Sequence, residues 1–204
     1  MKRLLFRIEI LIGQLLFYIC PSSLSGFIHS LRDKIYTGYI CKRFCHFGHS
    51  IIMWHPYSLQ GLQYITIGDN NIFESDLHLT AQVCDNNCNP QIIIGNKCLI
   101  RRGAHITAIN KICIGDGLLT GTNIFITDNS HGNTDSEMLS IPPRDRAIIS
   151  KGPVHIGNNV WLGNNVCIMP GVSIGDGAII GANAVVTHDI PPYSVAVGIP
   201  ARVI

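Results

Sequence analysis

The chain has 204 residues, of which 47% are hydrophobic and 14% charged, and this composition excludes a mainly disordered protein. Its formal net charge of +2 is too small to indicate nucleic-acid binding. Because few charged residues are available to cover a monomer, we expect part of the surface to be buried between subunits.

The first 46 residues combine apolar sequence with basic charge. Seven Lys and Arg against two acidic residues give this segment +5, whereas the rest of the chain carries −3. The apolar run at 10–20 is about half of the ~20 residues that a transmembrane helix needs, and no convincing signal-peptide cleavage site follows it. We expect an interfacial helix here and a second helix at about 26–46. Two roles stay open: peripheral contact of 1–46 with the inner face of a membrane, or a cap on the following domain.

The eight cysteines show no spacing typical of a small disulfide-bonded domain. Cys84 and Cys88 are further apart than the usual zinc pair, and no second pair follows them. We therefore expect free thiols in a reducing cytoplasm and no bound metal.

An internal repeat begins near residue 67. Every sixth residue is aliphatic, glycine often follows it, and Asn, Asp or Gly fills the turns. The clearest run contains Ile156, Leu162, Ile168, Ile174, Ile180 and Val186. Three such hexapeptides close one triangular coil of short strands, and coils must stack because one coil cannot bury its own ends.

The same register extends upstream through Ile94, Ile100 and Ile106, and then, after a slip near 112, through Ile114, Thr120 and Ile126. Ile67, Phe73 and Leu79 form a poorer first coil. The pattern breaks at about 83–93 and again at about 132–153. We predict an all-β parallel β-helix over 65–204, after a helical arm and lead-in at 1–64, with 132–153 as a functional loop.

These repeats resemble the hexapeptide-repeat acyltransferases. The segment from "GPVHIGNNVWLG" to "GIPARVI" is similar to sugar O-acetyltransferases of the galactoside and maltose type. The segments "ITDNSHG" and "IPPRDRAIISKGPV" resemble acetyltransferases of surface-polysaccharide biosynthesis. The resemblance implies a left-handed β-helix, acetyl-CoA as co-substrate, and a homotrimer with sites between subunits.

Acetyl transfer to a sugar hydroxyl needs a base, and imidazole is suited to this role near neutral pH. His131 ends a coil just before the long excursion, which is where the family places its catalytic histidine. Asp128, Asn129 and Glu137 are candidates for orienting its ring, and the sequence does not choose among them. The alternative is a histidine that only caps the loop.

The resemblance also implies the cofactor contacts. The backbone amide of Asn164 corresponds to one beside the thioester, and Ala182 to another backbone contact. Thr187 and His188 correspond to a Thr-Lys pair, so His188 removes a fixed positive charge, and Arg202 is suited to a phosphate. Trp161 is expected near the pantetheine channel or the acceptor pocket; its alternative role is packing against a neighbouring subunit.

The acceptor contacts differ from those of the galactoside enzymes, because Arg101 and Ile109 replace an Asn and an Asp. This disfavours a simple galactoside, and Arg101 suits a charged acceptor or caps a turn. The sequence predicts an acetyl-CoA-dependent O-acetyltransferase acting on a saccharide in surface-polysaccharide biosynthesis. Alternatives are another hydroxyl or amine acceptor (an antibiotic, an amino sugar or serine) or a non-catalytic scaffold. A β-helical carbonic anhydrase is disfavoured because Ser136 stands where a second metal-binding histidine is needed.

Overall fold

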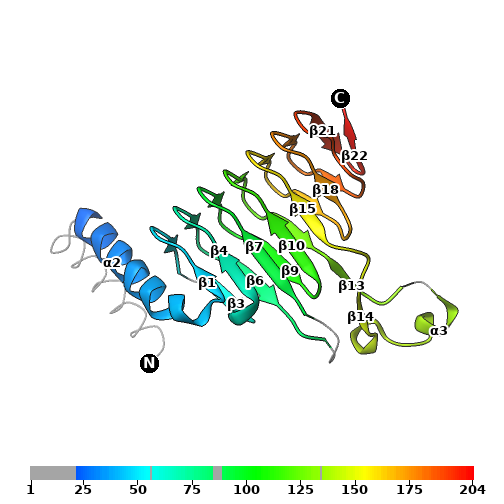
Figure 1. The fold of residues 1–204 in the computed structure, drawn as a ribbon, viewed down its shortest axis with the longest axis horizontal. Coiled ribbons are helices and arrows are strands. Elements are labelled where there is room, and N and C mark those ends of the chain that lie inside the picture. Colours follow the sequence, from blue (N-terminus) through cyan, green and yellow to red (C-terminus); the bar gives the residue numbers. More distant parts are fainter. Residues whose placement is uncertain (1–21, 56, 85–88, 134) are drawn as a thin grey trace, which may run out of the picture.

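The computed structural model describes residues 22–55, 57–84, 89–133 and 135–204. Helix α2 (Ser22–Ile40) and the short 3-10 helix η1 (Cys41–Arg43) lead into a tapering stack of triangular coils, and α2 lies across its N-terminal end (Figure 1). The predicted second helix is therefore confirmed, whereas the apolar run at 10–20 lies outside the described residues. Among the described helices, none is long and apolar enough to cross a membrane.

Three parallel sheets form the faces of the prism. Sheet A contains β1 (His46–Phe47), β4 (Ile65–Ile67), β7 (Gln91–Ile94), β10 (Lys111–Ile114), β15 (Val154–Ile156) and β18 (Ser173–Ile174). Sheet B contains β2 (Ile52–Met53), β5 (Ile72–Phe73), β8 (Leu99–Ile100), β11 (Leu119–Thr120), β16 (Trp161–Leu162), β19 (Ile179–Ile180), β21 (Val195–Gly198) and the antiparallel β22 (Ala201–Val203). Sheet C contains β3 (Tyr57–Gln60), β6 (Leu77–Ala81), β9 (His105–Ala108), β12 (Phe125–Thr127), β17 (Cys167–Ile168) and β20 (Val185–Val186).

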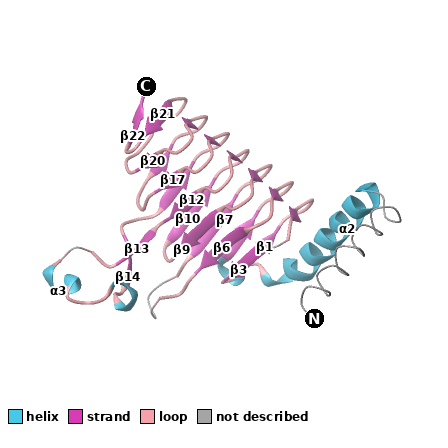
Figure 2. Ribbon diagram, turned by 180° about the vertical axis from the view of Figure 1, so that it is seen from behind, coloured by secondary structure: helices cyan, strands magenta, loops and turns pink. Residues whose placement is uncertain are grey.

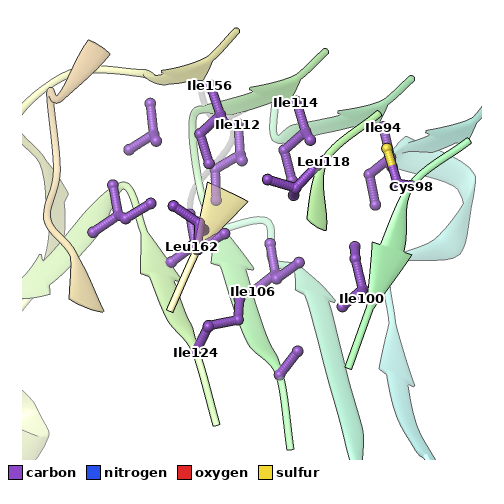
Figure 3. Close-up of a cluster of buried hydrophobic side chains, with 14 of the residues drawn as sticks. Ile94, Cys98, Ile100, Ile106, Ile112, Ile114, Leu118, Ile124, Ile156 and Leu162 are labelled. Carbon is purple, nitrogen blue, oxygen red and sulfur yellow. The ribbon is translucent and has the colours of Figure 1, made fainter. Parts of the chain in front are cut away.

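The aliphatic residues at six-residue spacing fill the prism (Figure 3). Ile94, Ile100 and Ile106 are each 1% exposed or less, and the equivalent residues of the following coils stack on them. Thr120 occupies one of these inward positions; its Oγ1 accepts a hydrogen bond from the N–H of Arg101 at 2.9 Å, so the buried hydroxyl is satisfied. The predicted coils and the slip near 112 are confirmed.

The boundary predicted at 64/65 is wrong, because the β-helix begins at His46. Strands β1, β2 and β3 pair in parallel with β4, β5 and β6, so 46–60 form a complete first coil. This coil keeps six-residue spacing at Phe47, Met53 and Leu59, and Gly48 follows Phe47, whereas Trp54 and His55 follow Met53. The inward spacing was therefore present in the sequence, although the corner after Met53 carries no Gly, Asn or Asp.

The long excursion between β12 and β15 is confirmed. Strands β13 (Asn129–His131) and β14 (Ile148–Ser150) pair antiparallel at its base, with His131 opposite Ile148. Beyond them the chain forms helix α3 (Ser136–Leu139) and the 3-10 turn η3 (Pro143–Asp145). Figures 1 and 2 show this excursion projecting sideways from the prism.

Helix α2 packs one side on the first coil and exposes the other. Asp33, Thr37 and Ile40 are buried, and the Thr37 hydroxyl accepts a hydrogen bond from the N–H of Met53 at 3.1 Å. The opposite side exposes Phe27, Ile28, Leu31, Ile35, Tyr36 and Tyr39. Part of the arm thus covers the coil end while an apolar stripe stays uncovered.

Candidate active site

A groove of about 440 Å³ runs over the outer surface of sheet B and its corner with sheet C. It brings together four residues singled out from the sequence: Arg101, Trp161, Asn164 and Ala182. The remaining lining comes from the same stack of strands and turns: Leu119, Thr120, Gly121, Gly163, Ile179, Ile180 and Gly181.

One wall of the groove is an apolar ladder. Leu119, Trp161 and Ile179 lie opposite one another on neighbouring parallel strands. They point outward because alternate residues of a strand face opposite sides of the sheet, and Leu119 and Trp161 are 40% and 50% exposed. Periodicity places these three residues on one outer face, but only the structure shows that they border a groove.

The floor of the groove is backbone at the sheet B–C corner. Gly121, Gly163 and Gly181 follow the strands in successive coils. A Cβ placed on Gly163 would lie 2.5 Å from the amide nitrogen of Ala182, so the coils approach too closely for any side chain there. Glycine at this point leaves main-chain amides accessible from the groove.

Two of these amides, those of Asn164 and Ala182, have no acceptor among the described residues, and the cause is clearest for Asn164. In the preceding coil the N–H of Thr122 donates to Oδ1 of Asn164 at 2.9 Å. The residue that would serve the N–H of Asn164 in the same way is Ala182, which has no side-chain acceptor. Among the described residues, the Asn164 N–H therefore has no partner, although Asn164 lines the groove.

The guanidinium group of Arg101 lies at the end of the groove nearer the N-terminus. Nε of Arg101 lies 3.4 Å from Oε1 of Glu74, and the N–H of Arg102 donates to the other carboxylate oxygen at 3.0 Å. The Arg101 side chain is 49% exposed, so the ion pair contributes little stability and leaves guanidinium N–H groups available to an anionic ligand.

His131 is exposed on β13, at the far edge of sheet C. Between Gly121 on the groove floor and His131 the chain crosses the whole of β12, and His131 is not among the residues that line the groove. Within the described part of the chain, its ring nitrogens have no hydrogen-bond partner. The side chain of Glu137, one candidate for orienting the ring, lies outside what the structure describes.

Asp128, another candidate for orienting His131, has different partners. Its carboxylate accepts hydrogen bonds from the N–H groups of Ile109 and Asn110 at 3.0 and 2.9 Å, and from Nδ2 of Asn129 at 3.0 Å. The side chain is completely buried. This geometry ties β12 to the turn of the coil before it and gives Asp128 a structural role, while its role in orienting His131 stays a prediction.

The remaining expected cofactor residues lie apart from the groove, toward the C-terminal end. Thr187 Oγ1 lies 2.8 Å from Nδ1 of His188 in the turn after β20, and both residues are exposed. Nη1 of Arg202 on β22 donates to the carbonyl of Ala201 at 2.8 Å. As for the disfavoured zinc pair, Cys88 lies outside the described residues, and the described ones hold no group of three or more His, Cys, Asp or Glu that could bind a metal.

Comparisons with known proteins agree on one family. Residues 153–188 match the model of the bacterial transferase hexapeptide (six repeats). The Escherichia coli K12 protein named as a lipopolysaccharide biosynthesis O-acetyl transferase, WbbJ, is 33% identical over 184 residues, covering 89% of this chain and 88% of that protein. Nodulation protein L of Rhizobium meliloti strain 1021 is 34% identical over 173 residues, covering 84% and 86%. A solved galactoside acetyltransferase in complex with coenzyme A superposes with a TM-score of 0.58 at 29% identity, covering 95% of this chain and 78% of that one.

Proposed function

Because the chain belongs to the hexapeptide-repeat acetyltransferases and is an acyltransferase that uses acetyl-CoA, we propose that it acetylates a hydroxyl group of a saccharide. We also propose that its β-helix is left-handed. The observation that carries the proposed acetylation is the unpartnered N–H of Asn164 in the sheet B groove. A fixed main-chain donor in a partly apolar groove suits an acyl oxygen that gains negative charge during transfer.

The groove fits the acyl end of acetyl-CoA. Leu119, Trp161 and Ile179 offer an apolar wall for the pantetheine arm, and the glycine floor lets a ligand approach the amides of Asn164 and Ala182. When bound, the thioester supplies an acyl carbon that is open to attack by a hydroxyl oxygen. The Asn164 N–H would donate to the acyl oxygen, and the coil that holds it requires no rearrangement.

His131 is proposed as the general base, which accepts the hydroxyl proton at a ring nitrogen as the acceptor oxygen attacks. Since the groove and His131 stand at different corners of one prism, a complete site needs His131 from one copy and the groove from another. A homotrimer with closed threefold symmetry supplies three such pairs. Thr187, His188 and Arg202 would then serve the nucleotide end of the cofactor, with Arg202 as the phosphate partner.

The acceptor is proposed to be a saccharide of a surface polysaccharide or its lipid-linked precursor. The WbbJ protein is named for lipopolysaccharide biosynthesis, and the similarity to it spans most of both chains. Arg101 at the groove end would contact a hydroxyl or an anionic group of the acceptor. An amine acceptor is the competing possibility, and a panel containing both amino sugars and neutral sugars separates the two.

We also propose that α2 contacts the inner face of the membrane. Its exposed stripe of Phe27, Leu31, Ile35 and Tyr39 recurs every four residues, which places these side chains on one side of the helix. Lys34 and Lys42 are exposed nearby, and each basic residue near an anionic surface contributes about 1 kcal/mol. Replacing Leu31 and Ile35 with Gln should abolish co-sedimentation with anionic vesicles; unchanged co-sedimentation contradicts this contact.

The shared site is tested by complementation. His131→Ala should lower kcat by about 10²- to 10⁴-fold with little change in acetyl-CoA affinity, and Ala182→Asn should inactivate the groove by accepting the N–H of Asn164. If each site takes its base from one copy and its groove from the next, randomly mixed trimers regain about a quarter of wild-type activity. No recovery on mixing contradicts the shared site, and near-normal kcat for His131→Ala contradicts the base.

A further inference from the structure

A second pocket, of about 330 Å³, lies between α2 and the first coil and is lined by Gly26, His29, Ser30, Asp33, Ile52 and Trp54. We propose that it is a saccharide subsite, which holds a neutral sugar ring of an elongated acceptor while another ring is acetylated in the groove. This inference rests on the proposed function and names a second point at which the acceptor is held.

Trp54 provides a stacking surface for the sugar. Its side chain is 45% exposed although it follows a buried strand residue, Met53. The segment behind it is held by aromatic contacts, since the His55 ring stacks on Tyr36 at 5.6 Å and meets the edge of Tyr57 at 5.4 Å. An indole whose backbone is held in place and whose ring reaches a pocket suits the C–H face of a pyranose, which is apolar while its rim carries hydroxyls.

Asp33 provides the polar partner. Its side chain is only 10% exposed. Oδ1 accepts hydrogen bonds from the Arg32 guanidinium at 2.8 Å and from the N–H of His55 at 3.4 Å. Oδ2 has no partner among the described residues, and Asp33 lines the pocket. A carboxylate oxygen in this position accepts a sugar hydroxyl strongly and repels an anionic sugar, so the subsite should prefer neutral sugars.

The strand register connects this pocket to the groove. The N–H of Trp54 donates to the carbonyl of Phe73, and the N–H of Glu74 to that of Ile100, so Trp54, Glu74 and Arg101 occupy equivalent positions in three successive coils. Neighbouring strands are about 4.8 Å apart, which separates Trp54 from Arg101 by roughly 10 Å along the stack. Arg101 lines the groove, so an acceptor of a few sugar rings spans the two sites.

The two tryptophans of the sequence make the two sites separately observable. Trp161→Phe leaves Trp54 as the only indole and reports on the pocket, whereas Trp54→Phe leaves Trp161 and reports on the groove. Both single-tryptophan proteins are titrated with acetyl-CoA and with di- to tetrasaccharides of glucose, galactose, rhamnose, N-acetylglucosamine and glucuronate. We expect acetyl-CoA to change Trp161 emission, and at least one neutral oligosaccharide to change Trp54 emission saturably at millimolar concentration.

Three further substitutions are made in the Trp161→Phe protein. Asp33→Asn keeps an oxygen for the N–H of His55 but removes the charge, and should weaken saccharide binding at least tenfold. Gly26→Leu should abolish binding by filling the pocket, and it folds readily because a Cβ at Gly26 meets nothing within 4 Å. Gly38→Leu is the matched control, since Gly38 is an equally unobstructed position on α2 outside the pocket and should leave the affinity unchanged.

The inference is overturned if no neutral oligosaccharide in the panel changes Trp54 emission, or if Gly26→Leu binds like its parent. Preferred binding of the glucuronate-containing sugars would also overturn it, because the Asp33 carboxylate opposes them. If Trp161 does not respond to acetyl-CoA while Trp54 still responds to saccharide, the proposed function fails and the subsite stands.

Discussion

Two corners of the same prism use the same turn, but they differ in how many coils are joined by hydrogen bonds from turn amides to side-chain oxygens. At the corner between sheets A and B, a side-chain oxygen accepts the main-chain N–H of the coil before it in five successive pairs: His49 to Asp69 at 2.6 Å, Asp69 to Asn96 at 2.8 Å, Asn96 to Asp116 at 2.7 Å, Asp116 to Asn158 at 2.9 Å, and Asn158 to Asp176 at 2.6 Å. This series stops at Pro192. At the corner between sheets B and C, a single such bond is found among the described residues, from Thr122 to Asn164, and the next equivalent residue is Ala182.

The difference shows how a repetitive fold acquires a reactive position. Where the ladder continues, each bond uses the turn amide and ties two coils together, so that amide is not available to a ligand. One residue without an oxygen, Ala182, releases the N–H of Asn164 without changing the path of the backbone. The N–H of Asp176, which also has no partner among the described residues, lies away from the groove, whereas Asn164 lines it. The candidate reactive position is therefore set by the missing acceptor and the groove together.

The largest expected effect comes from giving the N–H of Asn164 a side-chain acceptor. Ala182→Asn places an oxygen where it can accept the Asn164 N–H, as Asn164 does for Thr122. We expect kcat to fall by about 10²- to 10³-fold, the usual loss when one oxyanion donor is removed. The measurement is steady-state kinetics with acetyl-CoA and the best acceptor from the panel.

Ala182→Leu is the matched control, because Leu has nearly the same shape as Asn but carries no acceptor. If bulk in the groove is the only cause, both variants lose the same activity, and the proposed role of the amide is wrong. A kcat at least tenfold lower for Asn than for Leu supports it.

The third corner, between sheets C and A, gives the next largest effect, on stability. Asp128→Ala removes the acceptor of the N–H groups of Ile109 and Asn110, and Ile109 is buried. Leaving a buried donor unsatisfied costs about 1–3 kcal/mol and the Asn110 N–H is exposed, so the free energy of unfolding measured in urea should fall by about 1–3 kcal/mol. We expect kcat, measured where the variant is folded, to change less than tenfold. Normal stability with a collapsed kcat would instead return Asp128 to the role of orienting His131.

Much of the fold could be predicted from the sequence because one physical rule repeats. The inward residues Ile94, Ile100 and Ile106 must be aliphatic to fill a narrow prism, and the same requirement recurs every six residues. The first coil was missed although it keeps the inward spacing; Trp54 and His55 follow Met53 at its second corner, where Arg101 and Arg102 stand two coils later. His55 stacks on Tyr36 of α2, and Trp54 lines the pocket beside this helix, so the corner contacts a helix instead of solvent alone.

The site was only partly predictable. Arg101, Trp161, Asn164 and Ala182 share a groove because fixed periodicity places equivalent positions above one another. The partners of Asp128 could not be predicted, since the N–H groups that donate to its carboxylate lie 18 and 19 residues away in the preceding coil and depend on the slip near 112. The relation of His131 to the groove also lies beyond a single chain, because the two stand at different corners.

The smallest expected effect concerns the pH dependence of stability at the corner between sheets A and B, where Asp116 lies. The pKa of Asp116 is lowered because the backbone N–H and the side-chain amide of Asn96 donate to its carboxylate. A lowered folded-state pKa means that the charged form stabilises the fold above the unfolded-state pKa, near 3.8, and that this stabilisation is lost as the pH falls through the folded-state value. Asp116→Asn should therefore lower Tm slightly at neutral pH, and the difference from wild type should shrink below about pH 4. Asp145→Asn, an exposed aspartate on the excursion, is the control. If the Tm difference for Asp116→Asn is independent of pH, the carboxylate charge does not stabilise this series of hydrogen bonds. The corner between sheets A and B is then stabilised without a contribution from that charge.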